Sequence, residues 1–199
     1  MDAVLRTFVA IALDAALLEA IDQVQGRYKR QVPPGSVKWV APDGIHLTLK
    51  FLGETPVSRV RAVEAALRSA CVGHAPFEFS VGGRGCFPNL RRPRVVWLGI
   101  QDRGRQLARL QESIEREIGP LGFPTEERGF SPHLTLGRIA RSAGPSEEVA
   151  VGQAVEMSVV DQLGMQRVNE VCLISSDLRP TGAVYHVLAM APLAGPAPD

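Results

Sequence analysis

The sequence predicts an α+β fold in which one unit is duplicated to form two lobes around a central groove. The first observation is that the letters His-Leu-Thr-Leu at 46–49 return at 133–136, 87 positions later (133 − 46). The second is that the same offset relates two apolar runs, 8–13 and 95–100. Self-similarity at a fixed offset is typical of a repeated structural unit. The repeated letters alone are weak support, and the matching apolar runs are what favour duplication.

The expected elements are strands mixed with helices, with few strict β-α-β units. This pattern favours two antiparallel sheets flanking the groove, with the helices on the outside. Strands are expected where apolar residues run continuously or alternate with polar ones. In chain order these strands are 6–13, 37–40, 45–52, 77–81, 95–100, 133–139, 155–160, 168–175 and 184–190.

Helices are expected where apolar residues recur every three or four positions. Asp14 is an N-cap residue for the first of them, and Gly26 is its expected end. The three expected helices are 14–26, 57–72 and 103–118. Residues 82–94 are rich in Gly, Pro and Arg, and 141–154 are small, polar and acidic, so both segments are expected to be loops.

Length and composition describe an ordinary globular protein. The 199 residues are 45% hydrophobic and 22% charged, with a formal net charge of +1. This balance excludes a chain-wide basic field, so any contact with nucleic acid must come from a local patch. We expect a single domain over 1–193, followed by a flexible tail over 194–199 that contains Gly, Pro and Ala.

Cysteine usage and hydropathy indicate the compartment. Cys71, Cys86 and Cys172 are widely spaced and form no Cys-x-x-Cys pair, which is typical of a reduced cytosolic protein. The N-terminus lacks a signal-peptide pattern, and no stretch of 18 apolar residues occurs. We therefore expect a cytoplasmic protein with no membrane contact. A monomer is expected because nothing suggests an obligate partner.

The repeated His-x-Thr pattern places reactive groups on one face of each strand. Residues two apart share a face, so His46 points with Thr48, and His133 points with Thr135. Across a pseudo-twofold axis, the two imidazoles would face each other with a hydroxyl beside each. One neutral imidazole can take a proton from water while the other, protonated, gives one to a leaving oxygen. With hydroxyls donating to the non-bridging oxygens, this suits in-line attack on a strained cyclic phosphate.

Three other interpretations of these histidines are weaker. A single His-x-Thr is most often structural, but two copies at matching positions favour function. A zinc site needs three or four ligands, and neither His46 nor His133 has Asp, Glu or Cys at ligand spacing. A Ser-His-Asp triad would need a Gly-x-Ser-x-Gly elbow, which the sequence lacks. We therefore expect no metal and no other cofactor.

The two His-x-Thr segments resemble the signature motifs of a known family. Residues 46–53 (HLTLKFLG) and 131–138 (SPHLTLGR) are similar to the motifs of the 2H phosphoesterase superfamily, and more narrowly of the RNA 2′,3′-cyclic phosphodiesterases, also called 2′-5′ RNA ligases. The resemblance implies a bilobal, duplicated α+β fold and hydrolysis of RNA 2′,3′-cyclic phosphate ends to 2′-phosphomonoesters without a metal. It also implies that His46 is the proton donor and His133 the proton acceptor. The residues alone do not order these two roles.

Two candidates for substrate binding depend on the strand geometry. Arg138 matches an arginine of the second motif, and a guanidinium suits phosphate. Strict alternation puts Arg138 on the face away from His133, so it reaches the groove only if the strand ends or bulges. Phe51 has the same parity relative to His46, which favours core packing over base stacking.

Three more candidates lie close to the motifs. Lys50 shares the parity of His46, so we expect it at the edge of the groove. Trp39 and Phe130 lie in connections beside the motifs and are alternative platforms for stacking a base.

Two functions of different classes fit these observations. The leading one is an enzyme whose substrates are RNA ends or nucleotides bearing a 2′,3′-cyclic phosphate, and whose reverse reaction would form a 2′-5′ linkage. The alternative is a non-catalytic module that binds RNA ends or nucleotides and uses its histidines only as hydrogen-bonding groups. Intact His and Thr in both copies favour the enzyme, because a binding protein could use Arg or Lys instead.

Overall fold

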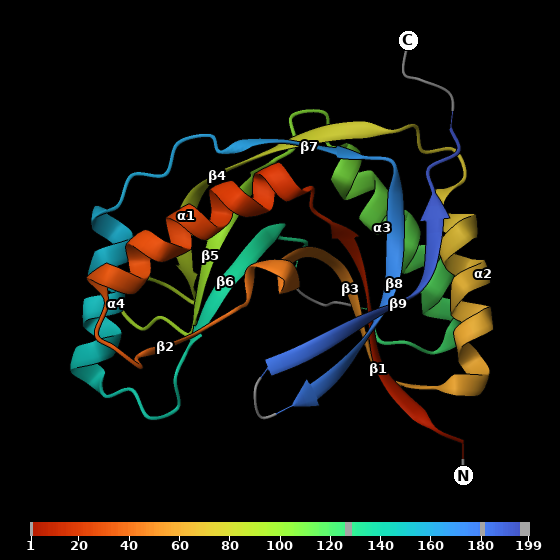
Figure 1. The fold of residues 1–199 in the computed structure, drawn as a ribbon. Coiled ribbons are helices and arrows are strands. Elements are labelled where there is room, and N and C mark those ends of the chain that lie inside the picture. The colour runs from red at the N-terminus through yellow and green to blue at the C-terminus, as the bar shows by residue number, and fades with distance from the viewer. Residues whose placement is uncertain (1, 126–128, 180–181, 196–199) are drawn as a thin grey trace.

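Nine strands form one curled antiparallel sheet, and four α-helices cover its outer surface in the computed structural model (Figure 1), which describes residues 2–125, 129–179 and 182–195. The strands are β1 Val4–Ala12, β2 Val37–Trp39, β3 His46–Pro56, β4 Phe77–Phe87, β5 Val95–Gln101, β6 His133–Ile139, β7 Gly164–Val168, β8 Glu170–Arg179 and β9 Gly182–Pro192. The helices are α1 Ala15–Gln31, α2 Val60–Cys71, α3 Gln106–Ile118 and α4 Pro145–Met157. The predicted α+β class with antiparallel strands and outer helices is confirmed.

The order of the strands is symmetric about the middle of the sheet. It runs β7-β4-β5-β6-β3-β1-β8-β9, with β2 attached to β6. Strands β3, β1, β8 and β9 are called here the first sheet half, and β6, β5, β4, β7 and β2 the second sheet half. The two halves meet at a single pair, Leu47 with Leu134, which are equivalent positions of the two copies. The two sheets expected from the sequence are therefore halves of one sheet that turns sharply at this pair.

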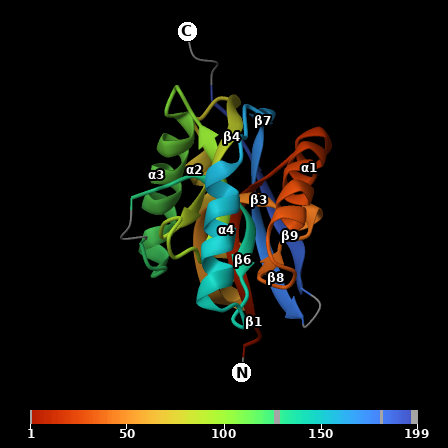
Figure 2. The same cartoon turned by 90° about the vertical axis from the view of Figure 1, so that its left-hand side faces the viewer.

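The helices cross between the halves. Helix α1 follows β1 in the chain, but it contacts α4 and β7 on the second half. Helix α3 follows β5, yet it packs on α2 and β3 on the first half. The views in Figures 1 and 2 agree that α1 and α4 cover one end of the molecule and that α2 and α3 cover the other. Each lobe is therefore built from both copies of the repeat.

Two expected boundaries are wrong, each for a local reason. Helix α1 has Asp14 as its N-cap, as expected, but it continues past Gly26 because Tyr28 is buried and bonds to Ser158. Strand β4 continues through the glycine-rich segment by means of a bulge, where Gly83 has a φ of 72°. The expected loop at 82–94 is thus strand as far as Phe87.

The expected loop at 141–154 and the expected strand at 155–160 are also wrong. Helix α4 occupies most of the first segment and half of the second, beginning with Pro145 at its first turn, and the Glu147 carboxylate accepts a hydrogen bond from the Gly144 backbone. It packs closely at Gly152, where an added Cβ would lie 1.9 Å from the Leu90 carbonyl oxygen. Strand β7, which follows, was not predicted.

A β-bulge follows each His-x-Thr at the same position of the repeat. On β3, Ala10 pairs with Thr48 and Val9 with Lys50, so Leu49 is the extra residue. On β6, Trp97 pairs with Thr135 and Val96 with Gly137, so the extra residue is Leu136. A bulge resets the alternation of side chains along a strand. Lys50 and Phe51, which precede a second register shift at Leu52, and the residues after Leu136 therefore lie on the opposite face from the one that strict alternation predicts.

A polar side chain from the crossing helix reaches each bulge. The buried Gln25 of α1 donates to the carbonyl oxygens of Leu136 (3.0 Å) and Val40 (2.7 Å). The Val40 amide also donates to the Leu136 oxygen, at 2.9 Å. The outward carbonyl that the bulge creates is thus satisfied inside the protein.

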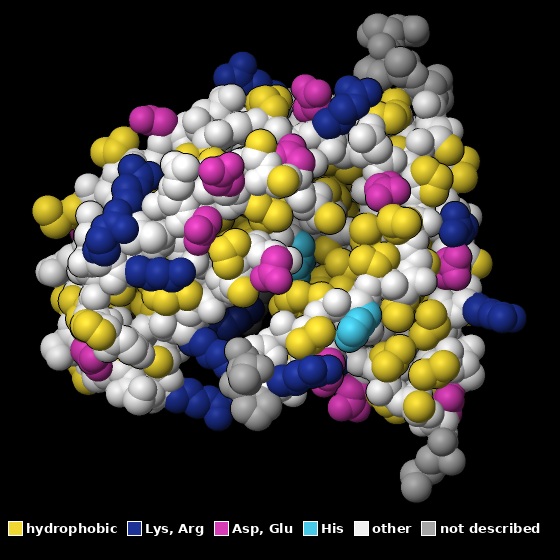
Figure 3. All heavy atoms as spheres, viewed as in Figure 1, with side chains coloured by type: hydrophobic (Ala, Val, Ile, Leu, Met, Phe, Trp, Pro, Cys, Tyr) yellow, Lys and Arg dark blue, Asp and Glu magenta, His cyan; other side chains and the backbone are white. Residues whose placement is uncertain are grey.

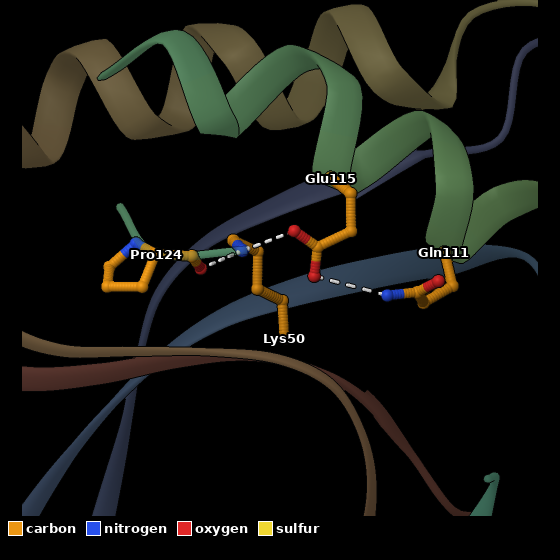
Figure 4. Close-up of polar contacts among 4 residues, drawn as sticks. All are labelled: Lys50, Gln111, Glu115 and Pro124. Atoms are coloured by element: carbon orange, nitrogen blue, oxygen red, sulfur yellow. Dashed lines mark hydrogen bonds and ion pairs between the residues drawn. The ribbon is translucent and has the colours of Figure 1, made fainter. Parts of the chain in front are cut away.

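The other bulge is supported by a buried ion pair. The Lys50 ammonium pairs with the Glu115 carboxylate of α3 at 2.5 Å and donates to the Pro124 carbonyl oxygen at 2.7 Å. Gln111 donates to the same carboxylate, and Figure 4 shows the four residues meeting between β3 and α3. Side-chain exposure is 1% for Lys50 and 14% for Glu115, so water replaces these partners poorly.

We expect Lys50→Met to lower the free energy of unfolding by about 3 kcal/mol, because the substitution leaves the Glu115 carboxylate without its cation in a poorly hydrated place. Urea denaturation followed by circular dichroism measures this loss. The double variant Lys50→Met/Glu115→Met should recover part of it. Lys29→Met, which changes an exposed lysine of α1, is the matched control and should be nearly neutral.

A double variant no more stable than Lys50→Met would show that the pair does not act as a unit.

Candidate active site

Both histidines open their strands at the centre of the sheet. Because β3 and β6 run antiparallel and meet at Leu47 and Leu134, the segments carrying His46 and His133 lie side by side. The leucines are fully buried, while both histidines and both threonines of the repeat are half-buried. Figure 3 shows the molecule hollowed between the two sheet halves, with Lys and Arg side chains gathered at the lower edge of the hollow.

His133 is fixed by its own backbone. Its Nδ1 lies 2.8 Å from the carbonyl oxygen of Ser131. A carbonyl can only accept, so Nδ1 carries the hydrogen, and in the neutral ring Nε2 is left with a free lone pair. The Phe87 ring meets the imidazole edge-on, with ring centroids 4.9 Å apart. This arrangement prepares Nε2 to accept a proton.

His46 lies in a more apolar environment. Its ring stacks on Phe8, with centroids 4.6 Å apart, and meets the edge of Tyr185 at 5.2 Å. Burial lowers the pKa of His46 below its ordinary value, because desolvation disfavours the charged ring, and a hydrogen bond with the Gly44 backbone opposes this shift. The two histidines therefore have matching positions but different surroundings.

Each threonine lies two residues after the histidine of its own strand, on the same face of the sheet. Thr48 pairs with Ala10 across β3 and β1, and Thr135 pairs with Trp97 across β6 and β5. Within the described part of the chain, neither hydroxyl is hydrogen-bonded to another side chain. Both hydroxyls are therefore available to a group bound beside the imidazoles.

The bulges bring Arg138 and Phe51 to the groove face. Arg138 meets the condition set for it, since the bulge at Leu136 reverses its direction. Burial raises the pKa of Tyr185, and the positive charges of Arg138 and Arg6 oppose that rise, so both cations lie near the tyrosine whose edge meets the His46 ring. Phe51 is 60% exposed, with its ring centroid 6.2 Å from that of Phe8. Core packing of Phe51 was the wrong expectation.

Two other expectations are wrong and one is left open. Lys50 does not reach the groove edge, because the bulge turns it into the ion pair with Glu115. Trp39 is not a free stacking platform, because its ring stacks on Tyr28 of α1, with centroids 6.5 Å apart and planes 5° from parallel. Phe130 is half-buried against the core, and a role for it in substrate binding stays a prediction.

Four aromatic residues beside the histidines were missed as site residues. Phe8 and Tyr185 flank His46, and Phe87 and Trp97 lie on the side of His133. Trp97 lies flat over β4, where a Cβ on Gly85 would come within 2.3 Å of its ring. Alternation along β1 could have identified Phe8, because Phe8 shares a face with Ala10, which pairs with Thr48. The position of Trp97 over Gly85 could not be predicted, because Gly85 lies in a segment that was expected to be a loop.

The described residues offer no candidate for a metal site and none for a membrane-spanning helix. No three His, Cys, Asp or Glu side chains lie together in a way that could hold a metal ion. No described helix is both long enough and apolar enough to cross a membrane. Cys71, Cys86 and Cys172 are buried free thiols, and burial raises the pKa of Cys71 and Cys86 to about 11.

Comparison with known proteins agrees with this geometry. The family described as LigT like Phosphoesterase matches twice in succession, over residues 11–97 and 98–185. A protein named RNA 2′,3′-cyclic phosphodiesterase from Methanothermobacter thermautotrophicus is 36% identical over 180 residues, covering 90% of this chain and 94% of its own. A protein of the same name from Archaeoglobus fulgidus is 34% identical, covering 91% and 96%.

Solved structures give the same result. The crystal structure of E. coli LigT complexed with 3′-AMP superposes with a TM-score of 0.76 at 26% identity, covering 96% of this chain and 99% of LigT. The complex of E. coli LigT with phosphate gives a TM-score of 0.70, also at 26% identity, covering 96% and 98%. The two matched segments span most of the sequence, and the resemblance noted from the His-x-Thr motifs is confirmed. The chain belongs to the LigT-like phosphoesterase family, a branch of the 2H phosphoesterases.

Proposed function

We propose that this protein hydrolyses the 2′,3′-cyclic phosphate at RNA ends to a 2′-phosphomonoester, with His46 and His133 as the proton-transfer pair and no metal ion. The observation that supports the proposal is the pairing of Leu47 with Leu134, which brings the two His-x-Thr segments together at the centre of the sheet. The relatives named RNA 2′,3′-cyclic phosphodiesterase support the choice of substrate.

In this mechanism His133 is the base. Its Nε2 takes a proton from the attacking water, whose oxygen forms a bond to phosphorus in line with the leaving 3′-oxygen. The hydrogen bond from Nδ1 to the Ser131 carbonyl supports this role, because it fixes the tautomer and stabilises the imidazolium that results.

His46 is the acid. It gives its proton to the ribose 3′-oxygen as the bond from phosphorus to that oxygen breaks. Burial disfavours the protonated ring in the free protein. An anionic phosphodiester beside the ring favours it, because an opposite charge at short range raises the pKa of a histidine. Substrate binding thus charges the acid that the reaction needs.

The neighbouring residues bind the charge and the bases. The Thr48 and Thr135 hydroxyls donate to the non-bridging oxygens, and Arg138 offsets the charge that develops on them. Phe51, which is exposed beside Phe8, offers a face for the terminal base. The same groups would serve the reverse reaction, in which a 5′-hydroxyl attacks the cyclic phosphate and a 2′-5′ linkage forms.

The working unit proposed here is the segment 1–193, acting as a monomer in the cytoplasm. Three buried free thiols support a reducing compartment. Residues 196–199 of the expected tail lie outside the described residues, and size-exclusion chromatography with light scattering tests the monomer.

We expect His46→Ala and His133→Ala each to lower kcat/KM for a 2′,3′-cyclic nucleotide by about 100-fold or more, because each removes one proton transfer. The assay is run in EDTA, and the folded state is checked by circular dichroism. Wild-type turnover in EDTA supports the two-histidine scheme. Tight binding without turnover would identify a binding module instead, and loss of activity in EDTA would indicate a metal.

We expect Thr48→Val and Thr135→Val to reduce catalysis less than the histidine substitutions do. Valine keeps the branched shape that a strand prefers and removes only the hydroxyl, and a lost donor to a developing anion costs at most roughly 3–4 kcal/mol. Steady-state kinetics on the same substrate measures this. Unchanged kinetics in both variants would mean that the hydroxyls do not contact the phosphate.

We expect a bell-shaped dependence of kcat/KM on pH, because one imidazole must be neutral while the other is protonated. The two limbs belong to the coupled pair. Because burial lowers the pKa of His46, a smaller fraction of the free protein keeps the acid's proton at alkaline pH, which lowers kcat/KM there, and a bound phosphate anion opposes this loss in kcat. A rate that rises steadily to high pH would instead indicate hydroxide or a metal-bound water as the nucleophile.

A further inference from the structure

We propose that the groove face of β1 beyond Phe8 binds the RNA nucleotide upstream of the cyclic end, with Arg6 contacting its phosphate. This inference rests on the proposed function and names its substrate class: oligoribonucleotides with a 2′,3′-cyclic phosphate end, in preference to free cyclic nucleotides.

Arg6 lies on the same face of β1 as the residues that contact the active site, two positions before Phe8. Residues 6, 8 and 10 alternate onto one face of β1, where Ala10 lies opposite Thr48 and Phe8 stacks on His46. Arg6 therefore lies about 13 Å along the strand from the level of Thr48. An arginine side chain extended from there reaches the neighbouring phosphate of a strand whose terminal phosphate is held at Thr48.

A depression of suitable size surrounds Arg6. It has a volume of about 510 Å³, within the range of small-molecule sites. Its lining residues come from neighbouring strands of the first sheet half: Val4, Arg6, Gly53, Glu54, Ser176 and Leu178. Val4 and Leu178 are 54% and 64% exposed. These apolar side chains can cover the face of a base.

The polar groups of the depression fit a ribonucleotide. Arg6 lies between Glu54 on β3 and Ser176 on β8. It is exposed, and it forms no ion pair with any carboxylate in the described part of the chain. An exposed guanidinium that is not paired with a carboxylate can bind a phosphate diester. Glu54 can accept a hydrogen bond from a ribose 2′-hydroxyl, the group that distinguishes RNA from DNA.

The proposed chemistry sets the direction of the strand. His46 protonates the leaving ribose oxygen, so the terminal ribose lies on the His46 side and water lies on the His133 side. The RNA therefore leaves the site over the exposed Phe51, which lies beside the buried Phe8, and continues along β1 to Arg6. Aromatic faces followed by a cation along the backbone are typical of single-strand binding grooves.

The test compares kcat/KM for a cyclic mononucleotide with kcat/KM for a dinucleotide and a trinucleotide that end in the same cyclic phosphate. We expect the wild-type ratio of dinucleotide to mononucleotide to exceed about tenfold, and Arg6→Gln to reduce that ratio by about tenfold through KM. Arg6→Lys should retain part of the preference. Arg68→Gln, which removes an exposed arginine of α2, is the control and should leave the ratio unchanged.

A wild-type ratio near one, or a ratio that Arg6→Gln does not change, would overturn the inference. So would a ratio that depends on Trp97 instead of Arg6, because the RNA would then lie on the second sheet half. These outcomes are distinct from failure of the proposed function, in which the mononucleotide itself is not hydrolysed.

Discussion

The bulge that follows each His-x-Thr is the constraint on which the groove depends. Without Leu49 and Leu136 as extra residues, Phe51 and Arg138 would point into the core and the groove would lose both. Each bulge is held by a polar residue of the crossing helix, Gln25 for one and Glu115 for the other. These two residues are 90 positions apart (115 − 25), three more than the repeat, because the helices have shifted while the strands have not. Both bulges are therefore contacted by a helix residue at a similar place in the repeat, but one contact is an amide hydrogen bond and the other is an ion pair.

Symmetry of the backbone does not make the two histidines equal. His46 and His133 open equivalent strands, yet one is stacked on Phe8 and the other bonds to the Ser131 carbonyl. The apolar rings around His46 desolvate it, and burial therefore lowers its pKa. A duplicated unit supplies two proton carriers at one spacing, and the differing neighbours separate their tasks. The aromatic surroundings that create this difference came from segments outside the repeated motif, such as Tyr185.

The sequence predicted the centre of the site better than its surroundings. Periodicity and the repeat located β6 to the residue and identified the His-x-Thr faces, because those depend only on alternation within one strand. The bulges depend on contacts from the other half of the chain, so alternation misplaced Lys50 and Phe51. Helix α4 carried a readable start at Pro145 and Glu147, but its small, weakly patterned residues concealed it. Trp39 was misread because its partner, Tyr28, lies beyond the expected end of α1.

The crossing of the helices has a consequence for how the chain acquires its structure during synthesis. When β1, α1 and β3 leave the ribosome, α1 can contact only the short segment around β2 and the turn at 42–44, since its other main contacts are with α4 and β7, much later in the chain. The first lobe in turn lacks α3 and β8 until they are made. Neither copy can bury its apolar strands by itself, so the nascent protein stays incomplete until nearly all of it has emerged. Late closure of this kind is a condition in which chaperones protect exposed strand edges.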